Sequence, residues 1–359
     1  MRLVDLSIRD FRNVASAALR PNPRFNIFEG RNGQGKTNVL EAVWVLGALR
    51  SFRPATNAEL VRFEAEEAEV RGVVETAASV GRTVRLLISP GGRRVWVDGK
   101  LARSLESSLG QLSVVLFAPE DLAITKGSPA GRRRFLDRAV FNRWPASLGD
   151  LRRYEEALKQ RNALLKKGAA DTYLEVFDEP LARAGAQVLT WRARYLEAFR
   201  PLFSECLTEV TAGELAADLH YEGTVSDATP EAILGALAED RRKDRARGTT
   251  SRGPHRDDLS VMLMGHDARI FASQGQHRSL VLAMKIAEIR LLQAGLGESP
   301  ILLLDDVSSE LDQERNASLM RYLTGPAFGG QVFLTTTDRA HIRIDSDYSA
   351  FTIRGGQVG

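Results

Sequence analysis

Short apolar runs separated by turn residues fill the first third of the chain, and this pattern predicts a region rich in β-strands. The runs cover residues 2–8, 25–28, 70–74, 83–88, 93–97 and 113–117, and the turn sequences SPGG and VDGK stand among them. We therefore expect mixed α/β structure with antiparallel hairpins as far as about Phe117.

In the middle of the chain the apolar period becomes that of a helix. Residues 151–167 place Leu151, Tyr154, Leu158 and Leu165 at helical spacing, and a second series runs from Leu181 to Leu202 in steps of three and four. Two such helices pair as an antiparallel arm or pack as ordinary bundle helices of a compact subdomain, and the pattern leaves both arrangements open.

Strand patterns return from Leu259 onward. They cover residues 259–264, 301–306, 331–337 and 351–356, and helices are predicted after Gln276 and after Glu310. The sequence thus predicts an α/β fold with a mixed sheet, formed by residues 1–118 and 253–359. A mainly α-helical domain, residues 119–252, is inserted between them.

Composition restricts the class of protein. The chain has 359 residues, enough for about two domains, and its single cysteine excludes an internal disulfide framework and a cysteine-rich zinc site. The N-terminus is charged from its second residue, and no apolar run approaches the roughly 18 residues that a membrane span needs. We expect a cytoplasmic protein with no membrane partner. The net charge of +3 permits an anionic partner without requiring one.

The strongest chemical signal is GRNGQGKT, which lies between an apolar run and a helical pattern. It fits GxxxxGK[ST], in which glycines let backbone N–H groups surround phosphates, the lysine reaches the outer phosphates and the hydroxyl binds Mg²⁺. The expected nucleotide-binding residues are Gly30, Arg31, Asn32, Gly33, Gln34, Gly35, Lys36, Thr37 and Asn38.

The C-terminal part carries residues that complement this loop. ILLLDD is an apolar strand that ends in Asp305, expected to hold Mg²⁺ with Thr37, and Asp306, expected to orient the attacking water. SSELD follows at residues 308–312. The segment SQGQ combines a hydroxyl, a glycine and a helix N-terminus, so Ser273, Gly275 and Gln276 are expected to form a second anion site.

The order of these motifs resembles the ATP-binding-cassette ATPases of the chromosome-maintenance (SMC) branch and, within it, the RecF family of bacterial recombination mediators. The resemblance extends over nearly the whole chain, in FRN (11–13), GRNGQGKTN (30–38), FAPEDL (117–122), GRRRFLD (131–137), KQRNALL (159–165), GPHRDDL (253–259) and SQGQHRSL (273–280).

This resemblance implies a cassette-type ATPase head and an ATP-dependent homodimer. Each ATP, with Mg²⁺, would lie between the phosphate loop of one subunit and the signature segment, SQGQ (273–276), of the other. It implies weak DNA-dependent ATP hydrolysis, binding to duplex DNA at gaps and single-strand junctions, and loading of RecA together with RecR and RecO. Lys36 and Asp306 would act in catalysis. Arg12, in FRN, would contact nucleotide, with an exposed structural arginine as the equal alternative.

Departures from the wider cassette pattern modify these expectations. The second acid of the strand end is Asp306 where most relatives outside the family have glutamate, so we expect slow hydrolysis. Phe117 is followed by Ala-Pro-Glu-Asp, at a place where transporter ATPases have a glutamine. Thr337 and Asp338 stand where transporter ATPases have a histidine. The identity of the γ-phosphate sensor therefore stays open.

A basic run at residues 241–256 predicts a DNA surface independently of the family. Duplex DNA presents about one phosphate charge per 1.7 Å of axis, so dense cations give a salt-sensitive affinity, and no base-reading motif accompanies them. A solvated surface is the plain alternative. The expected DNA-binding residues are Arg241, Arg242, Lys243, Arg245 and Arg247 of this run, with Arg132 and Arg133 of GRRRFLD.

Two other functions are weighed against a DNA-dependent ATPase. The ATPase subunit of a membrane transporter would share the phosphate loop and signature, but it does not need the basic, helical residues 119–252. A nuclease would need an acidic or histidine cluster outside the nucleotide site, and the five histidines are scattered along the sequence.

Overall fold

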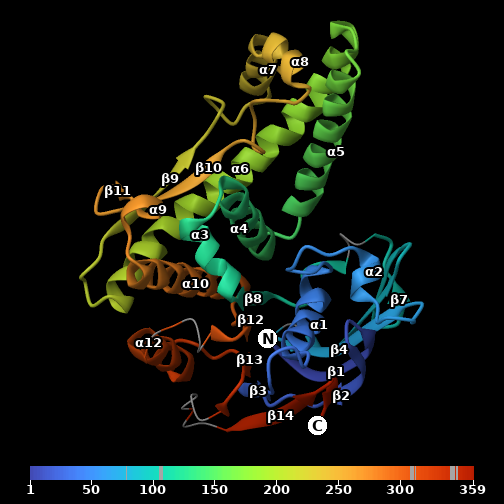
Figure 1. Ribbon diagram of the computed structural model, residues 1–359, viewed down its shortest axis with the longest axis vertical. Coiled ribbons are helices and arrows are strands. Elements are labelled where there is room, and N and C mark those ends of the chain that lie inside the picture. Colours follow the sequence, from blue (N-terminus) through green and yellow to red (C-terminus); the bar gives the residue numbers. More distant parts are fainter. Residues whose placement is uncertain (78, 105–107, 308–310, 312, 340–343, 345–346) are drawn as a thin grey trace. The chain divides into compact units, whose positions relative to one another are not determined.

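The computed structural model describes residues 1–77, 79–104, 108–307, 311, 313–339, 344 and 347–359. They form two compact units (Figure 1). Unit 1 comprises Met1–Asp121 and Leu282–Gly359, and unit 2 comprises Leu122–Val281. Residues 253–281, which were predicted to belong to the split head, pack within unit 2, because strand β10 (Asp258–Leu263) pairs with strand β9 (Ala217–Glu222) of the helical region.

Unit 1 contains a six-stranded sheet of order β2-β1-β4-β5-β6-β7, and the pairs along it are antiparallel. Four side chains of β1 are buried, and the remainder are exposed or partly exposed, as expected of a half-buried sheet. The strict alternation is interrupted near its start, where the pairing with β4 shifts register between Leu3 and Asp5. The buried residues are Leu3, Leu6, Ile8 and Phe11. The bounds are β1 Arg2–Phe11, β2 Val14–Leu19, β4 Ala68–Thr76, β5 Ser79–Ser89, β6 Gly92–Val97 and β7 Lys100–Leu101.

The second sheet of unit 1 has the order β15-β14-β3-β13-β12-β8, in which all pairs except β14–β15 are parallel. Its central strands are buried along their length, which matches their continuous apolar sequence. Because the strands are parallel, the residues that follow β3 and β12 lie at the same edge. The bounds are β3 Phe25–Glu29, β8 Val114–Phe117, β12 Ile301–Leu304, β13 Val332–Thr336, β14 Tyr348–Arg354 and β15 Gln357–Val358.

Helix α1, Lys36–Ala48, contacts strands of both sheets, which explains why nearly all its residues from Val39 onward are apolar and buried. Among the described residues, unit 1 also contains the α-helices α2 Asn57–Leu60, the C-terminal part of α10 Gln274–Leu296, and α12 Gln313–Thr324.

Unit 2 is mainly helical and includes a small antiparallel sheet of order β11-β10-β9. Helices α5 and α6 pack through an apolar cluster that includes Tyr154, Leu181 and Val188, so the two predicted helices do form a pair (Figure 1). The bounds are α3 Ala123–Lys126, α4 Pro129–Arg143, α5 Ser147–Lys166, α6 Asp171–Val210, α7 Pro230–Glu239, α8 Arg241–Arg247, α9 Ala268–Phe271, β9 Ala217–Glu222, β10 Asp258–Leu263 and β11 His266–Asp267.

Buried ion pairs hold the elements of unit 2 together. Arg161 of α5 is fully buried and donates to Asp178 of α6 at 2.7 Å and to Asp244 of α8 at 2.7 Å. Arg192 of α6 pairs with Asp137 of α4 at 2.8 Å. Removing one partner of such a pair leaves a buried charge uncompensated, so these contacts specify how the helices dock.

A membrane-crossing helix is not found among the described residues, since none combines the necessary length and apolar character.

Candidate functional site

The phosphate loop, Gly30–Thr37, connects β3 to α1 at the carboxyl edge of the parallel sheet. Gly33 and Gly35 have φ angles of 77° and 111°, a region that favours glycine. Gly35 is the N-cap of α1 and has no side chain to bond the first N–H groups of the helix. These N–H groups, at the positive end of a helix dipole, are a suitable site for an anion.

Lys36 begins helix α1 and its side chain turns back over the loop. Its ammonium donates to the carbonyl oxygen of Gly30 at 2.6 Å and to that of Arg31 at 3.3 Å. Burial lowers the pKa of Lys36, and the charges of Asp306 and Asp305 oppose that shift. The ammonium is therefore held against the loop and lies close enough to the acid pair to interact with both charges, and its contact with phosphate stays a prediction.

A hydroxyl and a carboxylate from distant parts of the chain meet beside Lys36. Thr37 Oγ1 donates to Asp305 Oδ1 at 2.9 Å, and Thr335 Oγ1 of β13 donates to the same oxygen at 2.8 Å. Burial raises the pKa of the Asp305 carboxyl, while these two hydrogen bonds lower it. Oxygen ligands of this kind fit Mg²⁺, so the donor set agrees with the metal expected at a nucleotide phosphate.

Asp306 follows in a left-handed backbone conformation, with a φ of 49°. Its N–H donates to Thr335 Oγ1 at 2.8 Å, which fixes the turn after β12. A non-glycine residue in this conformation is strained, and such strain persists where surrounding contacts enforce it. Of the following SSELD segment, residues 308–312, only Leu311 is among the described residues.

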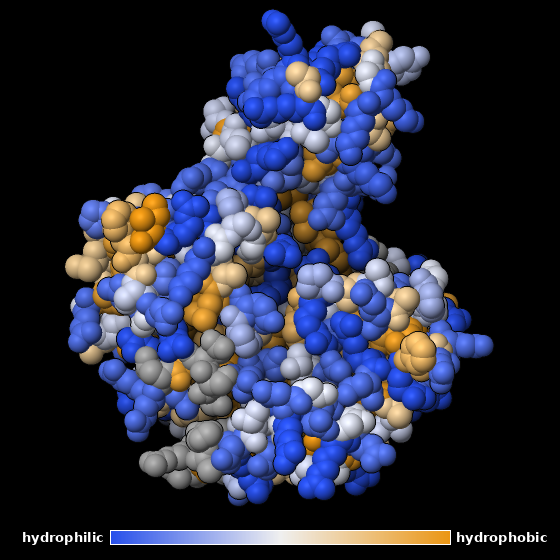
Figure 2. All heavy atoms as spheres, in the orientation of Figure 1, coloured by the Kyte–Doolittle hydropathy of each residue, from blue (hydrophilic) through white to orange (hydrophobic). Residues whose placement is uncertain are grey.

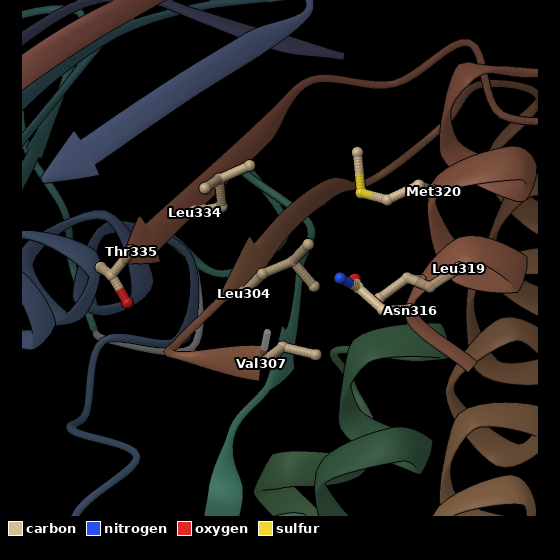
Figure 3. A pocket seen from close by; sticks show the side chains of 7 residues that line it. All are labelled: Leu304, Val307, Asn316, Leu319, Met320, Leu334 and Thr335. Atoms are coloured by element: carbon tan, nitrogen blue, oxygen red, sulfur yellow. The ribbon is translucent and has the colours of Figure 1, made fainter. Parts of the chain in front are cut away.

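A small cavity lies behind the strand that carries this acid pair, between β12, β13 and α12 (Figure 3). Its volume is about 20 Å³, and it is lined largely by apolar side chains. A space of this size holds about one water molecule, so it is not the site of a nucleotide. The lining residues are Leu304, Val307, Asn316, Leu319, Met320, Leu334 and Thr335.

Arg12 is anchored by protein groups. Its guanidinium donates to both carboxylate oxygens of Glu41 at 3.0 and 2.9 Å, and to the carbonyl of Glu59 at 2.9 Å. Glu41, on α1, is fully buried, and hydrogen bonds from Arg12, Arg53 and Ser51 outweigh the effect of burial and lower its pKa. Arg12 therefore has a structural role here, and its contact with nucleotide stays a prediction.

Arg53 and Glu120 are charged residues near the acid pair that the sequence analysis did not assign. The charge of Arg53 lowers the pKa of Asp305, whereas that of Glu120 raises it. Glu120 lies three residues after β8, the strand that pairs with β12 in parallel. The only sequence signal for this proximity is that an apolar run precedes each of the acids. Arg53 follows α1 in an irregular segment with no sequence signal of its own.

The signature segment, Ser273–Gln276, begins helix α10 as a reciprocal cap. Gln276 N–H donates to Ser273 Oγ at 3.2 Å, and Ser273 N–H donates to Gln276 Oε1 at 2.7 Å. This is the pairing of a capping box, which holds the helix start and leaves Ser273 exposed. The phosphate loop belongs to unit 1 and this segment to unit 2, so the two predicted anion sites lie in different units.

The motif GPHRDDL stabilises unit 2. Tyr154 and His255 Nδ1 are hydrogen-bonded at 2.6 Å, and burial lowers the pKa of His255 to about 4. Asp257 accepts a hydrogen bond from the hydroxyl of Tyr221 at 2.7 Å, and Asp258 accepts two from Arg132. The polar residues of this motif are therefore explained by packing within unit 2.

The basic run supplies fewer free charges than its sequence indicates. Arg241 pairs with Glu175 at 2.8 Å and Asp178 at 3.1 Å, and Arg245 donates to Asp171 at 2.9 Å. The acids come from α6, so the cations help to dock α8 on it. Lys243 pairs with Asp240 at 3.2 Å, although its side chain is exposed.

Arg242 and Arg247 are exposed, and no ion pair is found for either among the residues that the structure describes. Arg132 is only 4% exposed and pairs with Asp258 at 2.6 Å, while Arg133 donates to the carbonyl of Asp257 at 2.7 Å. The expectation that Arg132 offers its charge to DNA is therefore corrected, because that charge is neutralised inside unit 2.

Comparisons with known proteins find similarity along the whole chain. The profile of the RecF/RecN/SMC N terminal domain matches residues 2–355. Two similar proteins are both called DNA replication and repair protein RecF: one from Anaeromyxobacter sp. (strain K), 46% identical over 100% of this chain and 99% of that protein, and one from Myxococcus xanthus (strain DK1622), 45% identical over 100% and 97%.

Solved structures give the same picture. The structure of the recombination mediator protein RecF-ATPrS in the RecFOR pathway is similar with a TM-score of 0.91 at 33% identity, covering 99% of this chain and 97% of the other. The corresponding structure with ATP has a TM-score of 0.87 at 33% identity, covering 100% and 98%. An Smc head domain from Pyrococcus furiosus, 17% identical with a TM-score of 0.53 over 99% and 94%, shares the fold.

Proposed function

The chain belongs to the RecF/RecN/SMC N-terminal domain family, and we propose that it is an ATP-dependent DNA-binding protein of recombinational DNA repair. The observation that carries the proposal is the contact of Thr37 with Asp305 at 2.9 Å beside Lys36, because it joins phosphate loop and acid pair into one site. Similar proteins over the full length are named for DNA replication and repair, and similar solved structures hold ATP or ATPrS.

In the proposed reaction, the loop N–H groups and the Lys36 ammonium bind the phosphates of ATP. Thr37 and Asp305 would hold Mg²⁺, which neutralises charge that develops on the transferred phosphoryl group. Asp306 orients and polarises the attacking water. Its side chain is one methylene shorter than the more usual glutamate, so we propose that hydrolysis is slow. We propose also that DNA stimulates this hydrolysis and that it acts as a switch.

We propose further that ATP closes a homodimer in which the signature segment of one subunit completes the site of the other. Ser273 is exposed, as this role requires. Met264, Ile270 and Phe271, just before it in sequence, are each about two-thirds exposed, and Figure 2 shows apolar side chains gathered over β11 and α9. Exposed apolar patches of this kind mark interaction surfaces.

The proposed setting is the cytoplasm, at gapped DNA and at junctions of single and double strands. There the protein would help to load RecA together with RecR and RecO, which fits the RecFOR pathway named for the similar solved structures. Unit 2, residues 122–281, is proposed as an insertion into an ATPase head that the two segments of unit 1 form. The transporter alternative loses its support, since the proteins matched over the full length are RecF proteins.

Sedimentation of the purified protein with and without ATP and gapped DNA tests the proposal as a whole. We expect a monomer alone, a dimer with ATP, and a dimer bound to DNA when both ligands are present. A protein that stays monomeric with saturating ATP and DNA would contradict the switch.

Asp306→Asn is expected to bind ATP and to dimerise normally but to hydrolyse at least about a hundredfold more slowly, because it weakens water activation more than phosphate contact. The measurement is single-turnover hydrolysis together with ATP affinity. Asp305→Asn is the matched comparison and should weaken Mg²⁺-dependent binding instead. Normal hydrolysis by Asp306→Asn would place the base elsewhere.

Reversal of Arg242 and Arg247 to Glu is expected to weaken binding to duplex DNA and to spare ATP binding. For every DNA phosphate that the protein no longer neutralises, the plot of log affinity against log salt should flatten by roughly 0.9. Arg241 and Arg245 are unsuitable for this test, because they dock α8 on α6. The control is the same reversal at Arg71 and Arg103, which are exposed residues of unit 1. If the slope for the Arg242 and Arg247 variant equals that of the wild type, the basic run does not contact DNA.

A further inference from the structure

The carbonyl group of Gln34, in the middle of the phosphate loop, accepts two hydrogen bonds from outside the loop. Asn13 Nδ2, in the turn between β1 and β2, donates to it at 3.1 Å, and the N–H of Gly356, in the turn between β14 and β15, donates at 2.9 Å. The N–H of Gly355 also donates to the side-chain Oε1 of Gln34 at 2.7 Å. Two turns far apart in sequence therefore hold one loop residue.

The approach of these turns leaves no room for larger side chains. A Cβ at Gly356 would lie 2.0 Å from the carbonyl oxygen of Asn13, and one at Gly35 would lie 2.5 Å from Asn13 Oδ1. A Cβ at Gly30 would lie 2.5 Å from the carbonyl oxygen of Ile353, in β14. The two turns thus contact each other, and the Asn13 side chain and the backbone of β14 lie directly against the phosphate loop.

The amide of Asn13 is itself fixed in one orientation. Its Oδ1 accepts from Asn38 Nδ2 at 2.8 Å, while its Nδ2 donates to Gln34. Asn38 Oδ1 in turn accepts from Arg53 Nη2 at 2.6 Å. Since an arginine only donates, this chain of contacts determines which end of each amide is the donor.

In a trans peptide the C=O of one residue and the N–H of the next point in opposite directions. Donors that hold the Gln34 carbonyl from outside therefore direct the N–H of Gly35 to the other side of the peptide, toward the space that the loop encloses. This N–H comes directly before Lys36 and is one of those expected to bind phosphate. A loop held in this way loses less conformational freedom when an anion binds.

We propose that Asn13 and Gly356, whose N–H groups hold the Gln34 carbonyl, are positioning residues that keep the phosphate loop in its anion-binding conformation. The proposal rests on the proposed binding of ATP at this loop. It gives the β14–β15 hairpin a part in nucleotide affinity although the hairpin lies outside the phosphate-binding motif.

The test compares the same substitution at two neighbouring glycines of positive φ. Gly355 has a φ of 56° and nothing within 4 Å of its Cβ position, whereas Gly356 has a φ of 81° and the close contact with Asn13. Asparagine tolerates this backbone region better than most residues. Gly356→Asn is therefore expected to displace the loop, and Gly355→Asn to leave it in place.

The expected result is ATP affinity lowered about tenfold or more by Gly356→Asn and changed less than about twofold by Gly355→Asn. Amide hydrogen exchange of residues 30–37, measured without nucleotide, should also be faster in Gly356→Asn alone. Exchange reports on the loop directly, so a change confined to the hairpin itself would not produce this result.

Asn13→Asp provides a second test, in which the donor to Gln34 becomes an acceptor of the same shape and the hairpin is untouched. This variant should also lower ATP affinity about tenfold, and it tests the positioning role even if Gly356→Asn fails to fold. Wild-type affinity in both Gly356→Asn and Asn13→Asp would overturn the positioning role and leave ATP binding established. A wild-type protein that binds no ATP would overturn both proposals.

Discussion

Lys36→Met is expected to lower ATP affinity by at least about a hundredfold, since it removes a charge-assisted contact to the outer phosphates. The side chain is buried, and methionine retains most of its apolar stem. The change should therefore leave the thermal stability of the nucleotide-free protein nearly unaltered. Every ATP-dependent step, including dimerisation on DNA, should fail with it.

Isothermal calorimetry with ATP and Mg²⁺ provides the measurement. Lys100→Met is the control, because Lys100 is an exposed lysine of the same unit and its replacement should not matter. If Lys36→Met bound ATP as tightly as the wild type, Lys36 would have no place in the site and the phosphate-loop assignment would fail.

Features of the fold that depend on neighbouring residues were predictable from the sequence. The short apolar strands of the parallel sheet and the phosphate loop carry their signals within a few residues, as do the acids that follow β12. Strand β2, Val14–Leu19, was not predicted, because four of its six residues are alanine or serine, which have weak strand propensity. It forms because β1 offers it a pairing edge.

The state of a charged side chain was not predictable in the same way. The basic run and the arginine triplet look alike in sequence, yet Arg132 is buried against Asp258 and Arg241 is paired with acids of α6, while Arg242 is exposed. Helix packing decides which cations are neutralised, and the partners stand 126 and 63 residues away. Charge density in a sequence therefore overstates the charge that a surface offers.

The support of the phosphate loop was also invisible to the sequence. The hydrogen bond from Gly355 to Gln34 joins residues 321 apart, and neither residue type indicates such a contact. The signature segment shows the opposite case. Ser-x-x-Gln before an apolar helix is itself a capping pattern, so its local geometry was predictable, whereas its proposed role across a dimer rests on the family resemblance.

Mixing two inactive variants is expected to restore part of the DNA-stimulated ATP hydrolysis. Lys36→Met disables the phosphate loop and Ser273→Arg disables the signature segment, so homodimers of either variant contain two defective sites. In a mixed dimer, one site combines both lesions and the other combines an intact loop with an intact signature. The rescue follows if each site takes its two halves from different subunits.

The size of the rescue can be estimated. Homodimers of the variants have no intact site to close them, so random pairing of equal amounts makes at least half of the dimers mixed. Each mixed dimer has one intact site of two, so at least about a quarter of the wild-type rate is expected if the sites act independently. Ser273 also caps α10, and removal of a cap costs about 1 kcal/mol, so the thermal stability of Ser273→Arg must be checked before mixing.

A site completed within one subunit predicts no recovery, because every site would keep its own lesion. Crosslinking must first show that mixed dimers form, and the mixture is then assayed for hydrolysis and for tight ATP binding. Mixed dimers that neither hydrolyse ATP nor bind one ATP tightly would refute the arrangement across subunits. Mixed dimers that bind one ATP tightly without hydrolysis would instead show that the intact site forms across the interface. Turnover would then require both sites of the dimer to be intact.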